Sequence, residues 1–144
     1  MIELVTVLGI LITLSYFALP ALEVVQVRSR EKLLWKRLFA MRRAIDRYAA
    51  DRIGQATIYP TTIRALLEAD GISGPLLAGG SVGNPFSTSD DEFLWDIRDG
   101  LGNWHNSQNS VDNSFAEGIF DVRYPEAGVN GWQKAMDGTN YDQW

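Results

Sequence analysis

The amino-acid sequence predicts an α+β fold, in which one long N-terminal helix packs on a small antiparallel β-sheet and the C-terminal segment is rich in loops. The first observation is a run of 19 residues, Leu4 to Leu22, that contains no charged side chain. The second is a stripe of apolar residues at helical spacing between Leu34 and Tyr48. The third is a pair of short downstream segments whose apolar residues alternate as in β-strands. A chain of 144 residues has room for one hydrophobic core.

Charge divides the chain into two chemically different parts. Residues 1–52 carry nine basic and five acidic side chains (+4), whereas residues 53–144 carry four basic and thirteen acidic ones (-9), which sum to the net charge of -5. This acidic balance argues against a nucleic-acid-binding protein, because phosphate neutralisation needs a surplus of Lys and Arg. Cysteine is absent and His105, in a polar loop, is the only histidine, which excludes thiolate zinc sites and most catalytic triads. We therefore expect no enzymatic activity.

The uncharged run predicts a membrane-spanning helix. At about 1.5 Å rise per residue it reaches roughly 28 Å, close to the thickness of the hydrocarbon core of a bilayer. A cleaved signal peptide would need a basic region before the run and a small-residue cleavage site after it, and the sequence shows neither. The expected division is therefore a transmembrane segment over residues 1–24 and a globular domain over residues 25–144.

Two residues interrupt the apolar character of the transmembrane segment. Glu3 lies at the edge of the run, where it either pairs with a terminal ammonium group or stays hydrated at the helix N-terminus. Its local chemistry favours neither alternative. Pro20 lies inside the predicted helix and removes one backbone donor, so we expect a kink or local unwinding between about Tyr16 and Pro20.

Beyond the apolar run the same helix is expected to continue to about Arg52. No Gly or Pro occurs between Ala21 and Arg52, and the apolar residues recur at steps of four and three. The second half of the helix is therefore amphipathic and must pack on the globular domain. Its predicted buried face consists of Leu34, Leu38, Met41, Ile45 and Tyr48.

Short elements follow the long helix. A short helix after Tyr59-Pro60 is expected to begin at Thr61 as its N-cap and to end at Asp70-Gly71. The Gly-, Ser-, Pro- and Asn-rich segment Ile72–Asp91 predicts an exposed loop.

Two strands are predicted in the second half of the chain, over Glu92–Arg98 and Gly118–Arg123. The polar segment Asp99–Ser114 between them predicts turns. The tail, Tyr124–Trp144, predicts an ordered loop held by its aromatic side chains, which are Trp132, Tyr141 and Trp144.

The N-terminal segment resembles the mature N-terminus of the type IV pilin superfamily, in which a glutamate precedes a long apolar helix. Glu3 and Pro20 fall where that pattern has its glutamate and its helix proline. Tyr59-Pro60 before a short helix is similar to the order of elements in these subunits. The C-terminal residues 118–123 and 137–144 resemble the ending of the major pseudopilin of type II secretion systems.

This resemblance implies a structural subunit that polymerises through its N-terminal helix into a pseudopilus-like filament. The implied partners are copies of itself, other pseudopilins, the inner-membrane assembly platform and the membrane, with a prepilin peptidase acting on the precursor. The implied location is the inner membrane before assembly and a periplasmic or extracellular filament afterwards. In this pattern Met1 corresponds to the third mature position, so the family's basic leader and two mature residues would be expected before it. Two alternatives are a subunit of an extracellular type IV pilus and a membrane-anchored periplasmic binding domain.

The orientation in the membrane is not settled by charge. Residues 28–52 carry nine basic and three acidic side chains, and the positive-inside rule would place them in the cytoplasm. The family places them outside, and we follow the resemblance.

The C-terminal loop offers oxygen ligands for one metal ion. Major pseudopilins have a calcium-binding loop near their C-terminus, and Ca²⁺ prefers six to eight oxygen ligands. The resemblance therefore suggests a calcium site, but the family's usual acidic-glycine run is altered here. The alternative is a turn in which Asp137 accepts hydrogen bonds from backbone amides. The calcium ligands would be Asp137, Thr139, Asn140 and Asp142, with Asp112 and Asn113 as further contributors.

Overall fold

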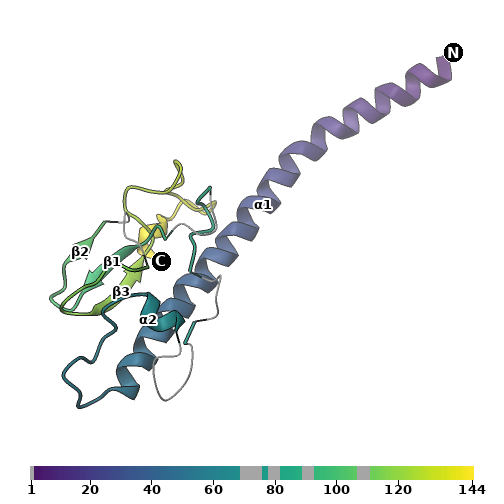
Figure 1. The fold of residues 1–144 in the computed structure, drawn as a ribbon. Coiled ribbons are helices and arrows are strands. Elements are labelled where there is room, and N and C mark those ends of the chain that lie inside the picture. Colours follow the sequence, from purple (N-terminus) through teal and green to yellow (C-terminus); the bar gives the residue numbers. More distant parts are fainter. Residues whose placement is uncertain (1, 69–75, 78–81, 89–92, 107–110) are drawn as a thin grey trace.

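The computed structural model describes residues 2–68, 76–77, 82–88, 93–106 and 111–144, with the backbone alone at residues 17–20. Its dominant element is helix α1 (Ile2–Asp51), a single helix of 50 residues that confirms the predicted long N-terminal helix. Figure 1 shows its C-terminal half lying against the rest of the molecule and its N-terminal half projecting away from it. The two halves therefore have different surroundings.

A three-stranded antiparallel sheet packs on the C-terminal half of α1 (Figure 1). Its strands are β1 (Asp96–Asp99), β2 (Trp104–His105) and β3 (Ile119–Arg123), in the order β2-β1-β3. Ile97 is paired with His105 on one side and with Val122 on the other, and the register shifts between Arg98 and Asp99. The α+β layout predicted from the sequence is thus observed.

Two strand predictions need correction. The second predicted strand is confirmed as β3, but the first begins at Asp96, because residues 93–95 are not paired in the sheet; Glu92 lies outside the described residues. Strand β2 falls in a segment that we predicted to contain only turns. It is two residues long and forms through the tight turn that connects it to β1.

The hydrophobic core lies between α1 and the sheet. All five residues of the predicted stripe on α1 are buried, from Met41 at 0% exposure to Tyr48 at 7%. Burying an aliphatic side chain of this size stabilises the fold by about 1.5–3 kcal/mol. The sheet and the tail contribute the opposite wall, which consists mainly of Trp95, Ile97, Ile119, Val122, Tyr124 and Tyr141.

Helix α2 (Arg64–Leu67) is shorter than predicted and begins differently. The hydroxyl of Thr62, rather than that of Thr61, accepts a hydrogen bond from the amide of Ala65 at 3.2 Å. The helix ends at Leu67, and the predicted stop at Asp70-Gly71 lies outside the described residues.

The prediction of an exposed loop over Ile72–Asp91 is wrong for several of its described residues. Leu77, Asn84 and Phe86 are buried. The Asn84 amide group donates to the carbonyl of Leu94 at 2.9 Å, and its oxygen accepts from the amide of Phe86 at 3.0 Å. Turn-forming composition predicts irregular backbone but does not predict exposure, and here the isolated apolar side chains reach the core.

The tail is an ordered loop that ends in a 3₁₀ turn, η1 (Tyr141–Gln143), as its aromatic residues predicted. Tyr141 is fully buried and lies 5.1 Å, between ring centroids, from Phe86, Tyr124 and Trp144. The Tyr124 hydroxyl donates to the carbonyl of Trp132 at 2.8 Å, and burial raises the pKa of Tyr124 to about 12. The tail is therefore part of the core rather than a loose extension.

Candidate functional site

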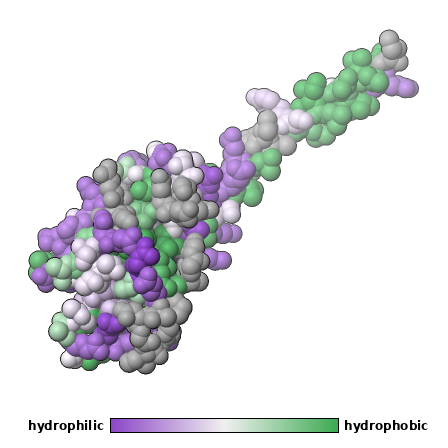
Figure 2. Space-filling view, viewed as in Figure 1, coloured by the Kyte–Doolittle hydropathy of each residue, from purple (hydrophilic) through white to green (hydrophobic). Residues whose placement is uncertain are grey.

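The N-terminal half of α1 is an exposed apolar rod. Its large side chains, from Ile2 to Val25, are 38–79% exposed wherever they are described. An 18-residue window of this helix has a mean hydropathy of 2.1 with none of it buried, which makes it long and apolar enough to cross a membrane. Figure 2 shows a hydrophobic surface along the outer part of this half, which stands apart from the mixed surface of the globular part. A soluble monomer rarely exposes so large an apolar surface, so this half needs another environment.

The Thr and Ser hydroxyls of this half donate hydrogen bonds within the helix. The hydroxyl of Thr6 donates to the carbonyl of Glu3 at 2.8 Å, that of Thr13 to Ile10 at 2.8 Å and that of Ser15 to Leu11 at 2.8 Å. Lipid offers no hydrogen-bond partners, so internal pairing of these donors lowers the cost of inserting the helix. Glu3 is left as the only charged side chain of residues 2–22.

Glu3 and Pro20 are the two residues to which the sequence analysis gave a role in assembly. Glu3 is exposed in the first turn of α1, at the end farthest from the globular part (Figure 1). The backbone remains helical through residues 17–20, so the local unwinding that we expected before Pro20 is absent from this structure. The roles of both residues in assembly stay predictions.

Two side chains of α1 fasten the tail to the helix. One carboxylate oxygen of Glu31 accepts hydrogen bonds from the amide of Met136 at 2.8 Å and from the hydroxyl of Tyr141 at 3.0 Å. Burial, together with the neighbouring Glu31 carboxylate, raises the pKa of Tyr141. Sequence reasoning missed Glu31, although it is the only acidic residue among the basic ones of segment 28–43.

Arg42 makes the second connection, eleven residues further along α1. Its Nε donates to Oδ1 of Asp121 on β3 at 2.9 Å, and its Nη1 donates to the carbonyl of Trp144 at 2.8 Å. One guanidinium group thereby joins the helix, the sheet and the last residue of the chain. This arrangement fixes the direction in which the N-terminal half leaves the globular part.

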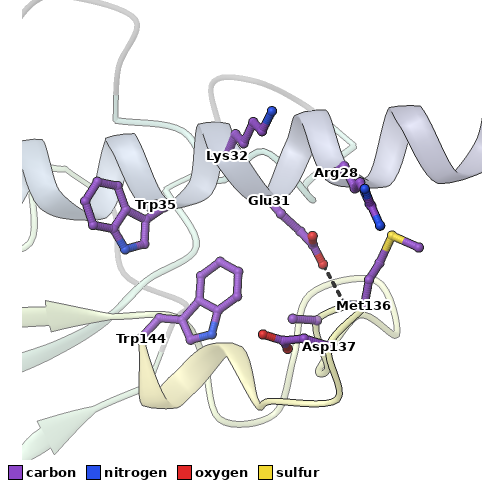
Figure 3. Close-up of a pocket in the computed structure, with 8 residues that line it drawn as sticks. Arg28, Glu31, Lys32, Trp35, Met136, Asp137 and Trp144 are labelled. Carbon is purple, nitrogen blue, oxygen red and sulfur yellow. Dashed lines mark hydrogen bonds between the residues drawn. The ribbon is translucent and has the colours of Figure 1, made fainter.

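A groove of about 450 Å³ lies between α1 and the tail, at the end of the globular part nearest the apolar rod. Figure 3 shows Arg28, Glu31 and Trp35 on the helix side and Met136, Asp137 and Trp144 on the tail side. The groove combines aromatic walls with basic and acidic groups. It can therefore accept an amphipathic side chain or a small polar molecule.

Two of the proposed calcium ligands, Asp137 and Thr139, are hydrogen-bonded to each other in this structure. Oδ1 of Asp137 accepts from the amide of Thr139 at 2.9 Å and from its hydroxyl at 2.7 Å, and these bonds lower the pKa of Asp137. The hydroxyl oxygen of Thr139 also accepts from Nε1 of Trp144 at 3.0 Å. Within the described residues no three His, Asp or Glu side chains gather as a metal site. The geometry agrees with the turn alternative.

The other suggested calcium ligands also have different surroundings. The Asp112 carboxylate forms an ion pair with Arg64 on α2, which lowers the pKa of Asp112. Asn113 and Asp112 are both exposed. Calcium binding therefore stays a prediction.

An Asp–His pair that the sequence analysis missed closes the β1–β2 hairpin. Asp99, 8% exposed, accepts hydrogen bonds from the amides of Leu101 at 3.0 Å and Asn103 at 2.8 Å, and its Oδ2 lies 2.8 Å from Nε2 of His105. The His105 hydrogen bond is the main cause that lowers the pKa of Asp99 to about 2. An Asp followed by Gly-Leu-Gly-Asn is typical of a side-chain-capped turn, and this signal could have found Asp99.

The Asp99–His105 pair also lines a cavity. Ser114 lines the same cavity of about 380 Å³, but no hydrogen bond joins it to His105 among the described residues. The imidazole packs on the Phe115 ring, 5.1 Å between centroids. The pair therefore serves to hold the hairpin.

Comparison of the chain with protein-family models, curated proteins and solved structures finds no match. Pilin-likeness therefore rests on the resemblance of the N- and C-terminal segments and is carried forward as a proposal.

Proposed function

We propose that this protein is a nonenzymatic subunit that polymerises through the N-terminal half of α1 into a filament resembling the pseudopilus of type II secretion systems. The observation that carries the proposal is the exposed apolar rod, Ile2–Val25, on an otherwise well-packed globular part. The resemblance of this rod to a pilin N-terminus supports a filament rather than a simple anchor.

One apolar surface serves both states of such a subunit. In the inner membrane, lipid would surround the single span and cover its apolar surface. In a filament, the rods of many copies would bury the same surface against one another, which removes apolar area from water at about 25 cal/mol per Å². The globular parts, with their charged surfaces, would then form the outside of the filament in the periplasm or beyond the cell.

Glu3 is the residue that we assign to register the incoming subunit. A carboxylate in a low-dielectric bundle is destabilised by several kcal/mol unless a cation pairs with it. The terminal ammonium group of a neighbouring copy would supply that cation. Because the pairing would occur only at one offset between two rods, it would select the correct axial position.

The test is filament yield from cells that make the full chain with a type II secretion assembly machinery. Glu3→Ala should leave the subunit folded and in the membrane but should abolish filaments in sheared fractions viewed by electron microscopy. Glu23→Ala is the matched control, since it removes the exposed carboxylate next to the other end of the rod. Normal filament yield from Glu3→Ala would remove the registration role. Absence of filaments from the unmodified chain would remove the proposed function itself.

A second candidate function is a membrane-anchored periplasmic binding domain that does not polymerise. The groove of about 450 Å³ between α1 and the tail is the observation that favours it. A small organic molecule retained by the purified protein, with no filaments under any condition, would support this candidate. A third alternative, a subunit of an extracellular type IV pilus, differs from the first in giving filaments that extend from the cell surface without overproduction.

A further inference from the structure

The C-terminal half of α1 carries an exposed stripe that its packing on the sheet does not use. The stripe residues recur at steps of 4, 3, 4 and 4 and lie on one side of the helix, away from the buried stripe. Trp35 is 54% exposed and Phe39 is 46% exposed, although both are large aromatic side chains. We call this surface the basic-aromatic stripe; it consists of Arg28, Lys32, Trp35, Phe39 and Arg43.

The stripe is already ordered in the single subunit. The rings of Trp35 and Phe39 are stacked, with centroids 5.2 Å apart and planes 7° from parallel. The guanidinium group of Arg43 lies over the Phe39 ring, 5.2 Å from its centroid. A surface that is ordered before binding loses little conformational entropy on contact, and Trp and Arg are enriched among the residues that dominate binding energy.

The structure points to a second copy of this chain as the partner, and we propose that the stripe receives the acidic globular surface of that copy. This inference rests on the proposed filament and names the contact between its globular parts. Charge complementarity carries the choice of partner. Residues 28–52 have nine basic and three acidic side chains, whereas residues 53–144 have a net charge of -9. Exposed carboxylates of the globular part include Glu68, Glu117 and Glu126.

The same charges determine the symmetry of the contact. A two-fold contact of stripe against stripe would bring Arg28, Lys32 and Arg43 of both copies together, and like charges at an interface are repulsive. A contact of basic helix against acidic globular surface joins two different faces. Contacts of this heterologous kind do not close on themselves and can continue into a helical filament. The charge asymmetry of the chain thus favours polymerisation over dimerisation.

The groove beside the stripe gives the contact a recess. Arg28, Lys32 and Trp35 belong to the stripe and also line the groove, whose far side includes Met136 and Trp144 (Figure 3). A side chain from the neighbouring copy can therefore enter next to the stacked aromatic rings. Cations at the rim would steer an acidic surface toward them.

The test compares two double variants of the full chain with a matched control. Arg28→Glu with Lys32→Glu reverses the charge, and Trp35→Ala with Phe39→Ala removes the aromatic surface. The control, Arg30→Glu, reverses an exposed cation on the opposite side of the same helix. Since all five residues are exposed, each variant should insert into membranes and melt as the unmodified globular part does. Each double variant should lower the yield of sedimentable filaments about tenfold or more, whereas the control should not.

Three results would overturn the proposal. The first is unchanged filament yield from both double variants, which leaves the proposed filament function standing and removes only this contact. The second is a disulfide between two Lys32→Cys subunits, which would place stripe against stripe; the chain has no cysteine of its own to interfere. The third is unchanged assembly of both double variants combined with a selective loss of vesicle binding. If the variants no longer bound vesicles that contain phosphatidylglycerol but still bound phosphatidylcholine vesicles, the stripe would be assigned to lipid. If the unmodified chain forms no filament, the proposed function and the contact fall together.

Discussion

The two halves of α1 are equally helical but differ in how their apolar residues are distributed around the axis. Leu8, in the N-terminal half, is 50% exposed, whereas Leu38, in the C-terminal half, is 3% exposed. Apolar residues surround the first half, whereas on the second half most of them lie in the buried stripe and Trp35 and Phe39 lie on the other side. The comparison teaches that the angular distribution of apolar side chains, rather than their number, decides whether a helix packs on its own domain or needs an external partner.

Removing residues 1–24 should change the behaviour of the chain most. We expect residues 25–144 to be a soluble monomer, because the exposed apolar rod is gone and the core lies entirely in the retained part. Fractionation and sedimentation velocity measure this. The full chain, extracted in detergent, is the control, and its globular part should melt at the same temperature. Aggregation of the shortened chain would show that the two halves depend on each other.

One substitution made in each half would sharpen the contrast. Leu38→Ala should lower the free energy of unfolding by about 2–5 kcal/mol, because it leaves a cavity between α1 and the sheet. Leu8→Ala should leave the unfolding of the globular part unchanged, since Leu8 contacts only solvent or lipid there. Denaturant titration of both variants in detergent measures the difference. Equal effects at the two positions would contradict the division of the helix.

Acid should act on the globular part through Asp99. The pKa of Asp99 is about 2, below the ordinary value near 3.9, so its ionised form stabilises the folded state above about pH 4. That stabilisation is lost as the pH falls from about 4 through about 2. Asp99→Asn should melt several degrees lower at neutral pH and should lose less stability than the unmodified chain between pH 4 and pH 2. Parallel pH profiles of the two proteins would assign the acid sensitivity elsewhere.

Calcium should have the smallest effect. Asp137 already accepts two hydrogen bonds from Thr139, so we expect the same melting curve in excess Ca²⁺ and in chelator. A calcium site would instead add about 2.7 kcal/mol at 100-fold saturation, a shift of several degrees. Asp137→Ala would then abolish that shift, and this result would replace the turn with a metal site.

The elements with regularly spaced apolar residues were predictable from the sequence. The extent of α1, its buried stripe and strand β3 follow from regular apolar spacing, and the aromatic residues of the tail predicted its anchors. Contacts between distant segments were not predictable. Glu31 is hydrogen-bonded to Tyr141, 110 residues away, and Arg42 to Trp144, 102 residues away. No local sequence pattern connects such positions.

The missed parts of the candidate site have physical reasons as well. Strand β2 is two residues long and depends on the turn capped by Asp99 rather than on its own β-propensity. The stack of Trp35 on Phe39 could not be predicted, because the sequence does not show that this side of α1 faces away from the core. Periodicity alone identified the buried side of α1 and gave no role to the other.

The contacts of Arg42 also determine when the domain can be completed during synthesis. The helix that carries Arg42 is made first, but its partners Asp121 and Trp144 lie 79 and 102 residues later. The buried stripe of α1 must therefore wait, uncovered, until the ribosome has produced the sheet and the tail that pack on it. Pairings of such large sequence separation also slow folding. The nascent chain consequently exposes two apolar surfaces, the rod and the buried stripe, and its own later residues cover only the stripe.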